Sequence, residues 1–397
     1  MKKNILIASF DLNVGGVERS LISMLNQFNY EEYNVDLMLY RHNGEFMDLL
    51  PIEPNLLKEL PHYATFRKSI KQVVREKYYA LGAVRLLSKC VAVTKGKIKT
   101  LDELGYYQMQ LMWKYSLPFL PALDKEYDVA ISYLWPHYFV GDKVKAKKKI
   151  AWIHTDYSTV YTDVDLDCLM WQKFDHIISI SPSCSEAFLH KYPTLSKKIV
   201  EVENITSPAF VKELANEGME ELKQNEHDFN LVSVGRLCFQ KGFDLAIQSM
   251  KLLVDKGYKN VKWYVVGSGE DEEQLKRSIQ ELGLENQFIL VGKKVNPYPY
   301  IKHCDLYVQP SRYEGKAVAV LEAQILEKPV LITNYPTASS QVTDGVDGVI
   351  TELSVEGIAS GIEKMLKNLL LREGLSKNNK ETDFRNSAEL EKLYKLF

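Results

Sequence analysis

The chain has 397 residues with a formal net charge of −2, and its 46% hydrophobic and 26% charged residues are typical of a soluble globular protein with two or more domains. Five scattered cysteines, an odd number without C-x-x-C spacing, argue against a disulfide framework or a zinc site and predict a reducing cytosol. The N-terminal run MKKNILIASF is too short for a signal peptide, and no apolar stretch approaches the roughly 20 residues of a membrane-spanning helix.

Short apolar runs alternate with helix-length segments in the first half of the chain, which predicts parallel α/β units. The predicted strands are residues 4–8, 35–39, 129–132, 150–153, 177–180 and 199–202, and the clearest helices are 17–28 and 183–191. Residues 66–114 interrupt the alternation and are predicted to be mainly helical.

A polar, acidic stretch at 213–228 is predicted to be a linker, and the alternation resumes after it. The predicted strands are 231–234, 261–266, 288–291, 306–308 and 330–332, with helices at 244–253, 271–282 and 318–326. This pattern predicts two tandem Rossmann-like domains, 1–205 and 206–380, and a C-terminal helix at 381–397 that packs back on the first domain. Ligands of such sheets bind at the carboxyl ends of the strands, so we expect the site in a cleft between the domains.

The segment SRYEGKAVAVLEAQILEKPVL carries two carboxylates, Glu314 and Glu322, with Gly315 directly after the first. Their spacing is a little over two helical turns, so both can address one ligand. We expect Glu314 in the loop before a helix and Glu322 farther along the same face, with backbone N–H groups of the helix N-terminus as an anion site between them. A nucleotide sugar, which combines phosphates with hydroxyls, suits this arrangement. The alternative is an acidic loop residue and an ordinary surface glutamate.

The segment VSVGRLCFQKGFDLAI places Gly235, Arg236 and Lys241 between a predicted strand and a predicted helix. An arginine can hold a diphosphate through two parallel hydrogen bonds, and a lysine can act on it as a point charge. The segment therefore predicts a diphosphate pocket, with two solvated loop cations as the alternative.

Two glycine turns also follow predicted strands. In FDLNVGGVERSL, Gly15 and Gly16 would let the backbone approach a ligand closely, although G-x-G-x-x-G spacing is missing and a plain strand-to-helix turn is the alternative. In VVGSGEDEEQL, Glu270 and Asp271 complement a helix dipole, and a structural role is favoured.

Two further positions follow strands at the edge where a ligand is expected. The loop after FILVG, with Lys293 and Val295, could enclose a flat base with backbone groups. His154 stands at the end of the strand in IAWIHTDYS. A lone histidine is usually structural, but this position favours contact with a substrate or a part in catalysis.

Together these motifs resemble the retaining, nucleotide-sugar-dependent glycosyltransferases of the GT-B fold in glycosyltransferase family 4. The resemblance covers essentially the full chain and is strongest over 231–350, where GRL, KG, VVGSGE, DLYVQPS-x-x-EG, LEA and KPV follow the family's order. It implies that Glu322 holds the ribose hydroxyls and that Glu314 approaches the donor sugar. It also implies diphosphate contacts from Arg236 and Lys241, a place for Gly15 and Gly16 near the phosphates and acceptor, and donor-sugar contact by His154.

The complete set of expected donor-binding residues is Gly15, Gly16, Gly235, Arg236, Lys241, Lys293, Val295, Glu314, Gly315, Lys316, Ala317, Val318 and Glu322. Lys316 departs from the family pattern, in which an aromatic or small residue often follows Glu-Gly, so the donor sugar stays open. Gln324 and Glu327 depart from the common A-C-G-x-P, and no chemistry is assigned to them.

The predicted reaction is sugar transfer from a nucleoside diphosphate, with UDP favoured, to a glycan or lipid-linked acceptor in bacterial cell-surface polysaccharide synthesis. Arg236, Lys241 and helix N-termini would stabilise the departing diphosphate, so neither a metal nor a cofactor is expected. The D-x-D pattern at Asp163 and Asp165 is assigned to a helix start rather than to a metal. A nucleotide-sugar 2-epimerase and a non-catalytic nucleotide-sugar-binding subunit are the alternatives.

The residues 66–99 carry ten cations and a single acid, Glu76, among apolar residues at helical spacing. The cations are Arg67, Lys68, Lys71, Arg75, Lys77, Arg85, Lys89, Lys95, Lys97 and Lys99. A basic amphipathic segment of this kind predicts docking on the anionic inner leaflet of the cell membrane, and a second lysine cluster at 143–149 adds to it. The alternative is a solvated helix face. Nucleic-acid binding is a third interpretation, but no recognition motif accompanies the charge.

Overall fold

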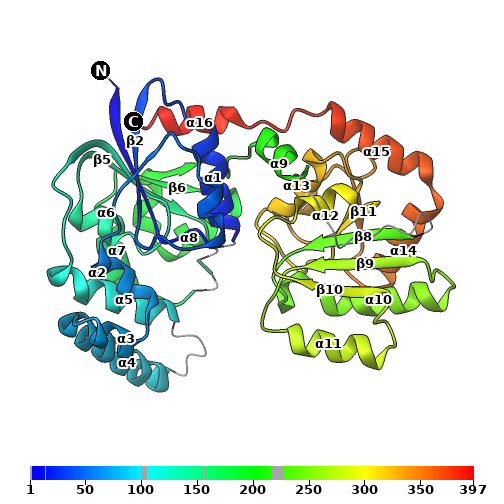
Figure 1. The fold of residues 1–397 in the computed structure, drawn as a ribbon, viewed down its shortest axis with the longest axis horizontal. Coiled ribbons are helices and arrows are strands. Elements are labelled where there is room, and N and C mark those ends of the chain that lie inside the picture. The colour runs from blue at the N-terminus through cyan, green and yellow to red at the C-terminus, as the bar shows by residue number, and fades with distance from the viewer. Residues whose placement is uncertain (1, 14, 100–104, 156, 159, 217–227) are drawn as a thin grey trace. The chain divides into compact units, whose positions relative to one another are not determined.

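The computed structural model describes residues 2–13, 15–99, 105–155, 157–158, 160–216 and 228–397, without the side chains of 96–99 (Figure 1). The chain divides into a first unit, Met1–Ile205 with Asn386–Phe397, and a second unit, Thr206–Arg385. Most of the predicted linker lies outside the described residues, and its first residues end helix α9 (Pro208–Leu214).

Seven strands among the described residues of the first unit form a parallel sheet in the order β3-β2-β1-β4-β5-β6-β7. They are β1 (Lys3–Ser9), β2 (Tyr33–Leu39), β3 (Asn55–Leu56), β4 (Glu126–Ser132), β5 (Lys145–Ile153), β6 (His176–Ser179) and β7 (Ile199–Glu201). Parallel strands are covered on both faces, which explains continuous apolar runs such as the fully buried Ile5, Leu6 and Ile7. The six strands predicted in this half are confirmed, and the two-residue β3 was not predicted.

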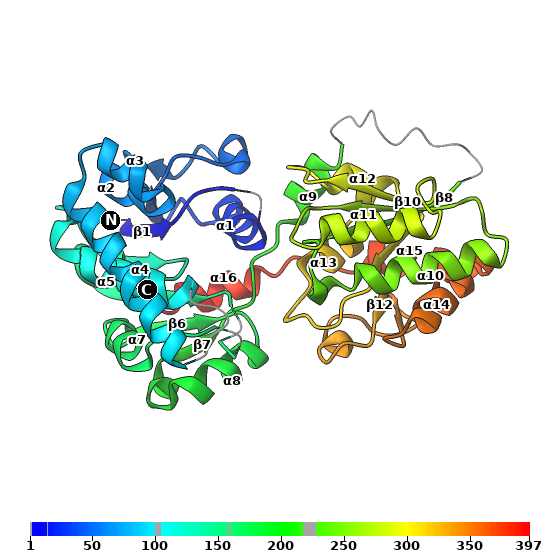
Figure 2. The ribbon, with the colours of Figure 1, turned by 90° about the horizontal axis from the view of Figure 1, so that it is seen from below.

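The helices of the first unit are α1 (Gly16–Gln27), α2 (Pro61–Ala64), α3 (Ile70–Arg75), α4 (Tyr79–Lys99), α5 (Gly105–Ser116), α6 (Tyr138–Lys143), α7 (Val164–Trp171) and α8 (Pro182–Lys191). The predicted helical character of 66–114 is confirmed by α3, α4 and α5, of which α4 packs against both others (Figures 1 and 2). The loop before α3 is anchored in the core, where Phe66 stacks on Trp113 with ring centroids 4.0 Å apart.

The end of the chain returns to the first unit as α16 (Ser387–Tyr394) (Figure 1). The Tyr394 hydroxyl accepts a hydrogen bond from the Asn29 backbone N–H at 2.8 Å, and its ring packs edge-on against Phe28 with centroids 5.3 Å apart. The second unit's last helix, α15 (Leu369–Glu381), ends before this segment.

The second unit has its own parallel sheet, in which six strands among the described residues run in the order β10-β9-β8-β11-β12-β13. They are β8 (Phe229–Val234), β9 (Val261–Val266), β10 (Phe288–Gly292), β11 (Leu306–Gln309), β12 (Val330–Thr333) and β13 (Val349–Thr351). The helices are α9, α10 (Phe243–Asp255), α11 (Glu272–Glu281), α12 (Tyr298–His303), α13 (Val318–Ile325), α14 (Val355–Lys367) and α15. The predicted strands and helices of this half are confirmed, and the order of the strands reverses between β8 and β11.

Helix α13 ends in a Schellman motif with a glutamate in the left-handed position. The N–H of Lys328 donates to the Ala323 carbonyl at 3.0 Å and the N–H of Glu327 to the Gln324 carbonyl at 2.9 Å, and Glu327 has a φ of 61°. Its carboxylate pairs with the half-exposed Lys212 at 2.9 Å. Glu327 is therefore strained at this position, where the family pattern has glycine, because a residue with a side chain disfavours left-handed backbone.

We expect Glu327→Gly to have a larger unfolding free energy than Glu327→Ala by about 1 kcal/mol. Both variants lose the ion pair with Lys212, so the comparison isolates the left-handed backbone. Chemical denaturation of the two variants measures it, and equal midpoints would show that Glu327 carries no strain.

Candidate functional site

The GRL–KG and SRYEG segments meet in the second unit because β8 and β11 are neighbours. These strands pair through Leu231 with Leu306 and Val232 with Tyr307. The loops 235–242 and 310–317 therefore leave the sheet side by side at the carboxyl edge, where the strand order reverses. Ligands of open parallel sheets bind at such a reversal.

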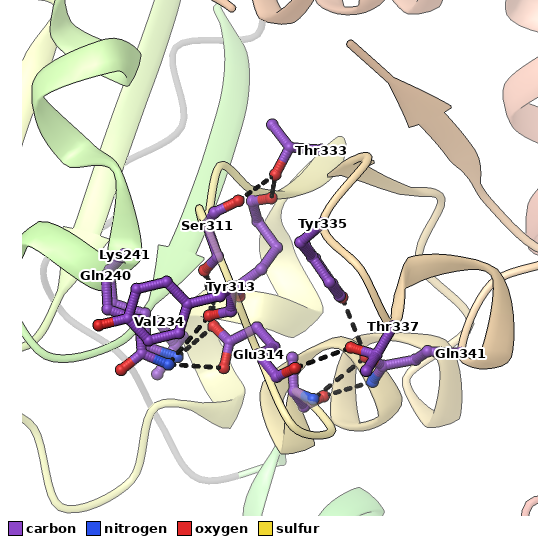
Figure 3. A network of polar contacts seen from close by, with 12 residues as sticks. Val234, Gln240, Lys241, Ser311, Tyr313, Glu314, Thr333, Tyr335, Thr337 and Gln341 are labelled. Carbon is purple, nitrogen blue, oxygen red and sulfur yellow. Dashed lines mark hydrogen bonds and ion pairs between the residues drawn. The ribbon is translucent and has the colours of Figure 1, made fainter. Parts of the chain in front are cut away.

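An ion pair between Lys241 and Glu314 joins the two loops, although the residues are 73 positions apart (Figure 3). The Lys241 Nζ lies 2.6 Å from Glu314 Oε1, and only 18% and 7% of the two side chains are exposed. The Ser311 hydroxyl donates to the same oxygen at 2.6 Å, and Gln240 Nε2 reaches Oε2 at 3.4 Å. The structure thus brings together a predicted diphosphate cation and the first predicted carboxylate, and it holds both in fixed positions.

Hydrogen bonds to backbone groups also join the two loops. The N–H of Arg312 donates to the Gln240 carbonyl at 2.8 Å, and Gln240 Nε2 donates to the Tyr313 carbonyl at 3.0 Å. Gly242 has a φ of 67°, and a Cβ built on it would lie 2.1 Å from the Pro310 carbonyl oxygen. Only glycine permits this turn and this approach.

The aliphatic stem of Lys241 lies over Gly235, where an added Cβ would meet the lysine carbons at 3.3 Å. Arg236 is exposed on the same loop. The predicted structural role of the VVGSGE turn fits its contacts: a Cβ on Gly267 would stand 1.9 Å from the Gly235 carbonyl oxygen, and the Leu237 N–H donates to the Ser268 carbonyl at 3.1 Å. This turn therefore supports the loop that carries the cations.

Glu322 is 1% exposed on α13, where its Oε1 accepts a hydrogen bond from the Tyr298 hydroxyl at 2.8 Å. Its partner is thus on α12, whereas the oxygens of Glu314 face the loop after β8. Lys293 and Val295 are exposed on the loop that leads from β10 to α12. Sequence reasoning missed Tyr298, because nothing in NPYPY distinguishes its first proline-tyrosine step from its second.

The segment between the two carboxylates begins with an open turn. Gly315 is exposed, and a Cβ on it would meet nothing within 4 Å, while Lys316 and Val318 are partly exposed. Ala317 is buried, and its N–H donates to Gln341 Oε1 at 3.1 Å. That N–H is therefore engaged within the protein, although the sequence had placed Ala317 among the donor-binding residues.

In the first unit, Gly15 and Gly16 open helix α1 after β1. A Cβ on Gly15 would lie 2.2 Å from Glu18 Oε2, so this glycine makes room for the carboxylate of the first helical turn. A Cβ on Gly16 would meet nothing within 4 Å. Because the Glu18 carboxylate is the far end of a flexible side chain, the contact does not by itself require glycine at position 15, and Gly16 is exposed.

His154 follows β5 and packs on Tyr133, with ring centroids 4.6 Å apart. Burial lowers the pKa of His154 to about 3, so the imidazole is neutral at pH 7. Its buried Nε2 has no hydrogen-bond partner among the described residues. His137 after β4, which the sequence did not single out, also has a pKa lowered to about 3 by burial and by His154.

Asp163 and Asp167, in the acidic run at the start of helix α7, have partners within the first unit. Asp163 is the N-cap, accepting from the Leu166 N–H at 3.3 Å, and pairs with Lys95 at 2.9 Å. Asp167 is buried, accepts from the Tyr192 hydroxyl at 2.5 Å, and has its pKa raised by burial. The predicted helix start is confirmed at Asp163.

Most of the second unit matches a known protein family. Residues 216–382 match the family model described as glycosyl transferases group 1. The capsular polysaccharide biosynthesis glycosyltransferase CapM of Staphylococcus aureus is 35% identical over 178 residues, which cover 43% of this chain and 47% of CapM. The chain thus matches about half the length of this relative.

Solved structures resemble the whole chain. Anabaena HepE in complex with UDP and glucose has a TM-score of 0.68 at 16% identity and covers 99% of this chain and 98% of its own. S. aureus TarM, in a complex with fondaparinux, alpha-GlcNAc-glycerol and UDP, has a TM-score of 0.69 at 15% identity, covering 99% of each chain. We conclude that the chain has the GT-B fold and that its residues 216–382 are similar to the glycosyl transferases group 1 family.

Proposed function

We propose that this protein is a retaining, metal-independent glycosyltransferase that moves a sugar from a nucleoside-diphosphate sugar to a hydroxyl of a glycan or lipid-linked acceptor in bacterial cell-surface polysaccharide synthesis. The observation that carries the proposal is the Lys241–Glu314 pair at the strand-order reversal of the second unit. The pair supports the proposal because a lysine suits a diphosphate, a carboxylate suits sugar hydroxyls, and the two stand on adjoining loops. UDP is the favoured nucleotide because HepE and TarM are both described in complexes with it.

In the proposed reaction the acceptor oxygen forms a bond to the anomeric carbon on the face from which the diphosphate leaves. The carbon–oxygen bond to the phosphate breaks, and the leaving phosphate oxygen takes the proton of the acceptor hydroxyl. Lys241 and the exposed Arg236 stabilise the negative charge that develops on the phosphate, the part a metal plays in other transferases. Glu322 binds the ribose hydroxyls, and neutral His154 donates or accepts a hydrogen bond at the donor sugar.

A thermal-shift and calorimetric screen of UDP-, GDP- and ADP-sugars tests the donor class. A ligand at a hundredfold excess over its Kd raises the unfolding free energy by about 2.7 kcal/mol, which is readily measured. Stabilisation by one nucleotide series supports the proposal, and no response to any series contradicts it. A free sugar isomer without a glycosidic product would instead identify an epimerase, and binding without turnover a non-catalytic subunit.

We also propose that the first unit docks on the anionic inner face of the cell membrane through helices α3 and α4. Four large apolar side chains are exposed on α4: Tyr79 (64%), Leu86 (56%), Leu87 (55%) and Val93 (40%). Tyr79, Leu86 and Val93 are seven residues apart and share one helix face. Apolar side chains exposed on one face of a basic helix support docking on a membrane surface. None of the described helices is both long and apolar enough to cross a bilayer.

Fewer of the cations serve this surface than the sequence suggested. Lys68 pairs with Glu76 at 2.8 Å, Lys95 pairs with Asp163, and Arg85 donates to the Thr65 carbonyl at 2.6 Å. The side chains of Lys97 and Lys99 lie outside the described residues. Among the cations of residues 66–99, those that are exposed and have no ion-pair partner in the described part of the chain are Lys71, Arg75, Lys77 and Lys89. Because these four have the same sign, an anionic surface complements them and a second copy of the same face repels them.

Replacing Lys71, Arg75, Lys77 and Lys89 together by glutamine should release the protein from anionic vesicles, because each cation contributes about 1 kcal/mol near such a surface. Co-sedimentation with vesicles in low salt measures this. The matched control replaces the exposed Lys259, Arg277, Lys364 and Lys380 of the second unit by glutamine, which removes the same charge and should leave binding unchanged. If the wild-type protein stays in solution with anionic vesicles, the surface is merely solvated.

A further inference from the structure

The loop that links Glu314 to helix α13 is held at both ends by the segment that follows β12 (Figure 3). At the first end, the Thr337 hydroxyl donates to the Glu314 carbonyl at 2.8 Å. At the second end, Gln341 forms a two-point contact with Ala317: its Nε2 donates to the Ala317 carbonyl at 2.6 Å, and its Oε1 accepts from the Ala317 N–H at 3.1 Å. Four residues of one loop are thus fixed by two side chains from another.

The orientation of Gln341 is itself determined by its surroundings. The Tyr335 hydroxyl donates to Gln341 Oε1 at 3.0 Å, so the amide oxygen accepts two hydrogen bonds and the amide nitrogen must face the Ala317 carbonyl. At the base of the segment, the Thr333 hydroxyl donates to the Ser311 carbonyl at 2.5 Å. The contacts therefore extend along the loop from Ser311 to Ala317.

These anchors matter because packing does not hold the loop at Gly315. Gly315 is exposed and no atom lies near the position of an added Cβ, so packing does not set its conformation. Glycine also has the widest choice of backbone angles. The direction in which the backbone of Gly315 faces is thus set in part by the anchors at Glu314 and Ala317.

We propose that Thr337 and Gln341 are positioning residues for the donor diphosphate, because they fix the backbone that carries Gly315 and Lys316 beside Lys241. The inference rests on the proposed function, since it assigns these residues to the same donor site. Neither side chain needs to touch the donor. Their part is to hold the loop in its binding conformation before the ligand arrives, so that no ordering cost falls on binding.

The test measures the affinities of uridine and UDP for each variant by calorimetry. Gln341→Met keeps the length of the side chain without its amide, and Thr337→Val keeps the shape of threonine without its hydroxyl. Each should weaken UDP binding about fivefold or more, whereas uridine, which lacks the diphosphate, should bind as it does to the wild type. Thr337→Ser restores the hydroxyl and should restore UDP affinity.

Ser340→Ala is the matched control. The Ser340 hydroxyl donates to the Thr337 carbonyl at 2.7 Å within the same turn, and it forms no hydrogen bond with the described residues of the Glu314 loop. This variant should bind UDP as the wild type does. Equal losses of uridine and UDP affinity, or unchanged UDP affinity in both Gln341→Met and Thr337→Val, would overturn the positioning role. A wild-type protein that binds no UDP, GDP or ADP would instead overturn the proposed function.

Discussion

Lys241→Met should lower turnover about 10²- to 10³-fold while the protein stays folded, because it removes a fixed positive charge from the leaving diphosphate. Methionine preserves the aliphatic stem that covers Gly235, so the loop keeps its packing. Glu314 keeps the hydrogen bond from Ser311 at 2.6 Å, and its carboxylate is not left without a donor. Initial-rate measurements with the donor that wild type accepts give the effect, and thermal denaturation checks the fold.

The control for Lys241→Met is Lys262→Met. Lys262 pairs with Asp228 at 2.7 Å in the same unit, and its side chain is 29% exposed against 18% for Lys241. Both variants lose a partly buried ion pair, but Lys262 is on β9 rather than on the loop after β8. A comparable loss of turnover in both would trace the effect to stability and remove Lys241 from the reaction.

Glu322→Gln should weaken binding of the nucleoside diphosphate by roughly 1.5–3 kcal/mol, because the ribose hydroxyls lose a charged acceptor. Glutamine is preferred to alanine here, since Glu322 is 1% exposed and a shorter side chain would leave a cavity beside Tyr298. The Tyr298 hydroxyl can still donate to the amide oxygen. Calorimetry with UDP measures the loss.

A ligand without the ribose 2′-hydroxyl separates this contact from general damage to the site. Wild type should bind 2′-deoxy-UDP more weakly than UDP, and Glu322→Gln should bind the two with nearly equal affinity. Tyr298→Phe, which removes the hydrogen bond to Glu322 Oε1 but leaves the carboxylate in place, should keep the discrimination. If Glu322→Gln discriminates between the two nucleotides as strongly as wild type, the ribose contact lies elsewhere.

Both sheets of the fold could be predicted from the sequence because parallel strands covered on both faces are continuous apolar runs. Strand β3, only two residues long, has no such run, and Asn55 and Leu56 carry no periodic signal. The sequence could predict that Lys241 and Glu314 lie near each other, since both follow strands at one edge of a parallel sheet. The ion pair itself was not, because it depends on β8 and β11 being neighbours.

The residues that sequence reasoning missed are those whose role is to contact another residue of the site. Tyr298, Thr337 and Gln341 are ordinary polar or aromatic residues in loops and short helices, and their significance lies in their hydrogen bonds with Glu322, Glu314 and Ala317, respectively. The number of cations at 66–99 that are available to a membrane was overestimated for a similar reason. A count of charges does not show that Lys95 meets Asp163, a residue 68 positions away.

The most direct test of the account is product analysis after incubation of the protein with UDP-sugars and a membrane extract as acceptor, in the presence of EDTA. For a retaining, metal-independent transferase we expect a glycosidic product with the anomeric configuration of the donor, stoichiometric release of UDP, a rate unaffected by the chelator, and loss of product in Lys241→Met. A product of inverted configuration, a free sugar isomer, or activity that returns only with added manganese or magnesium would contradict it.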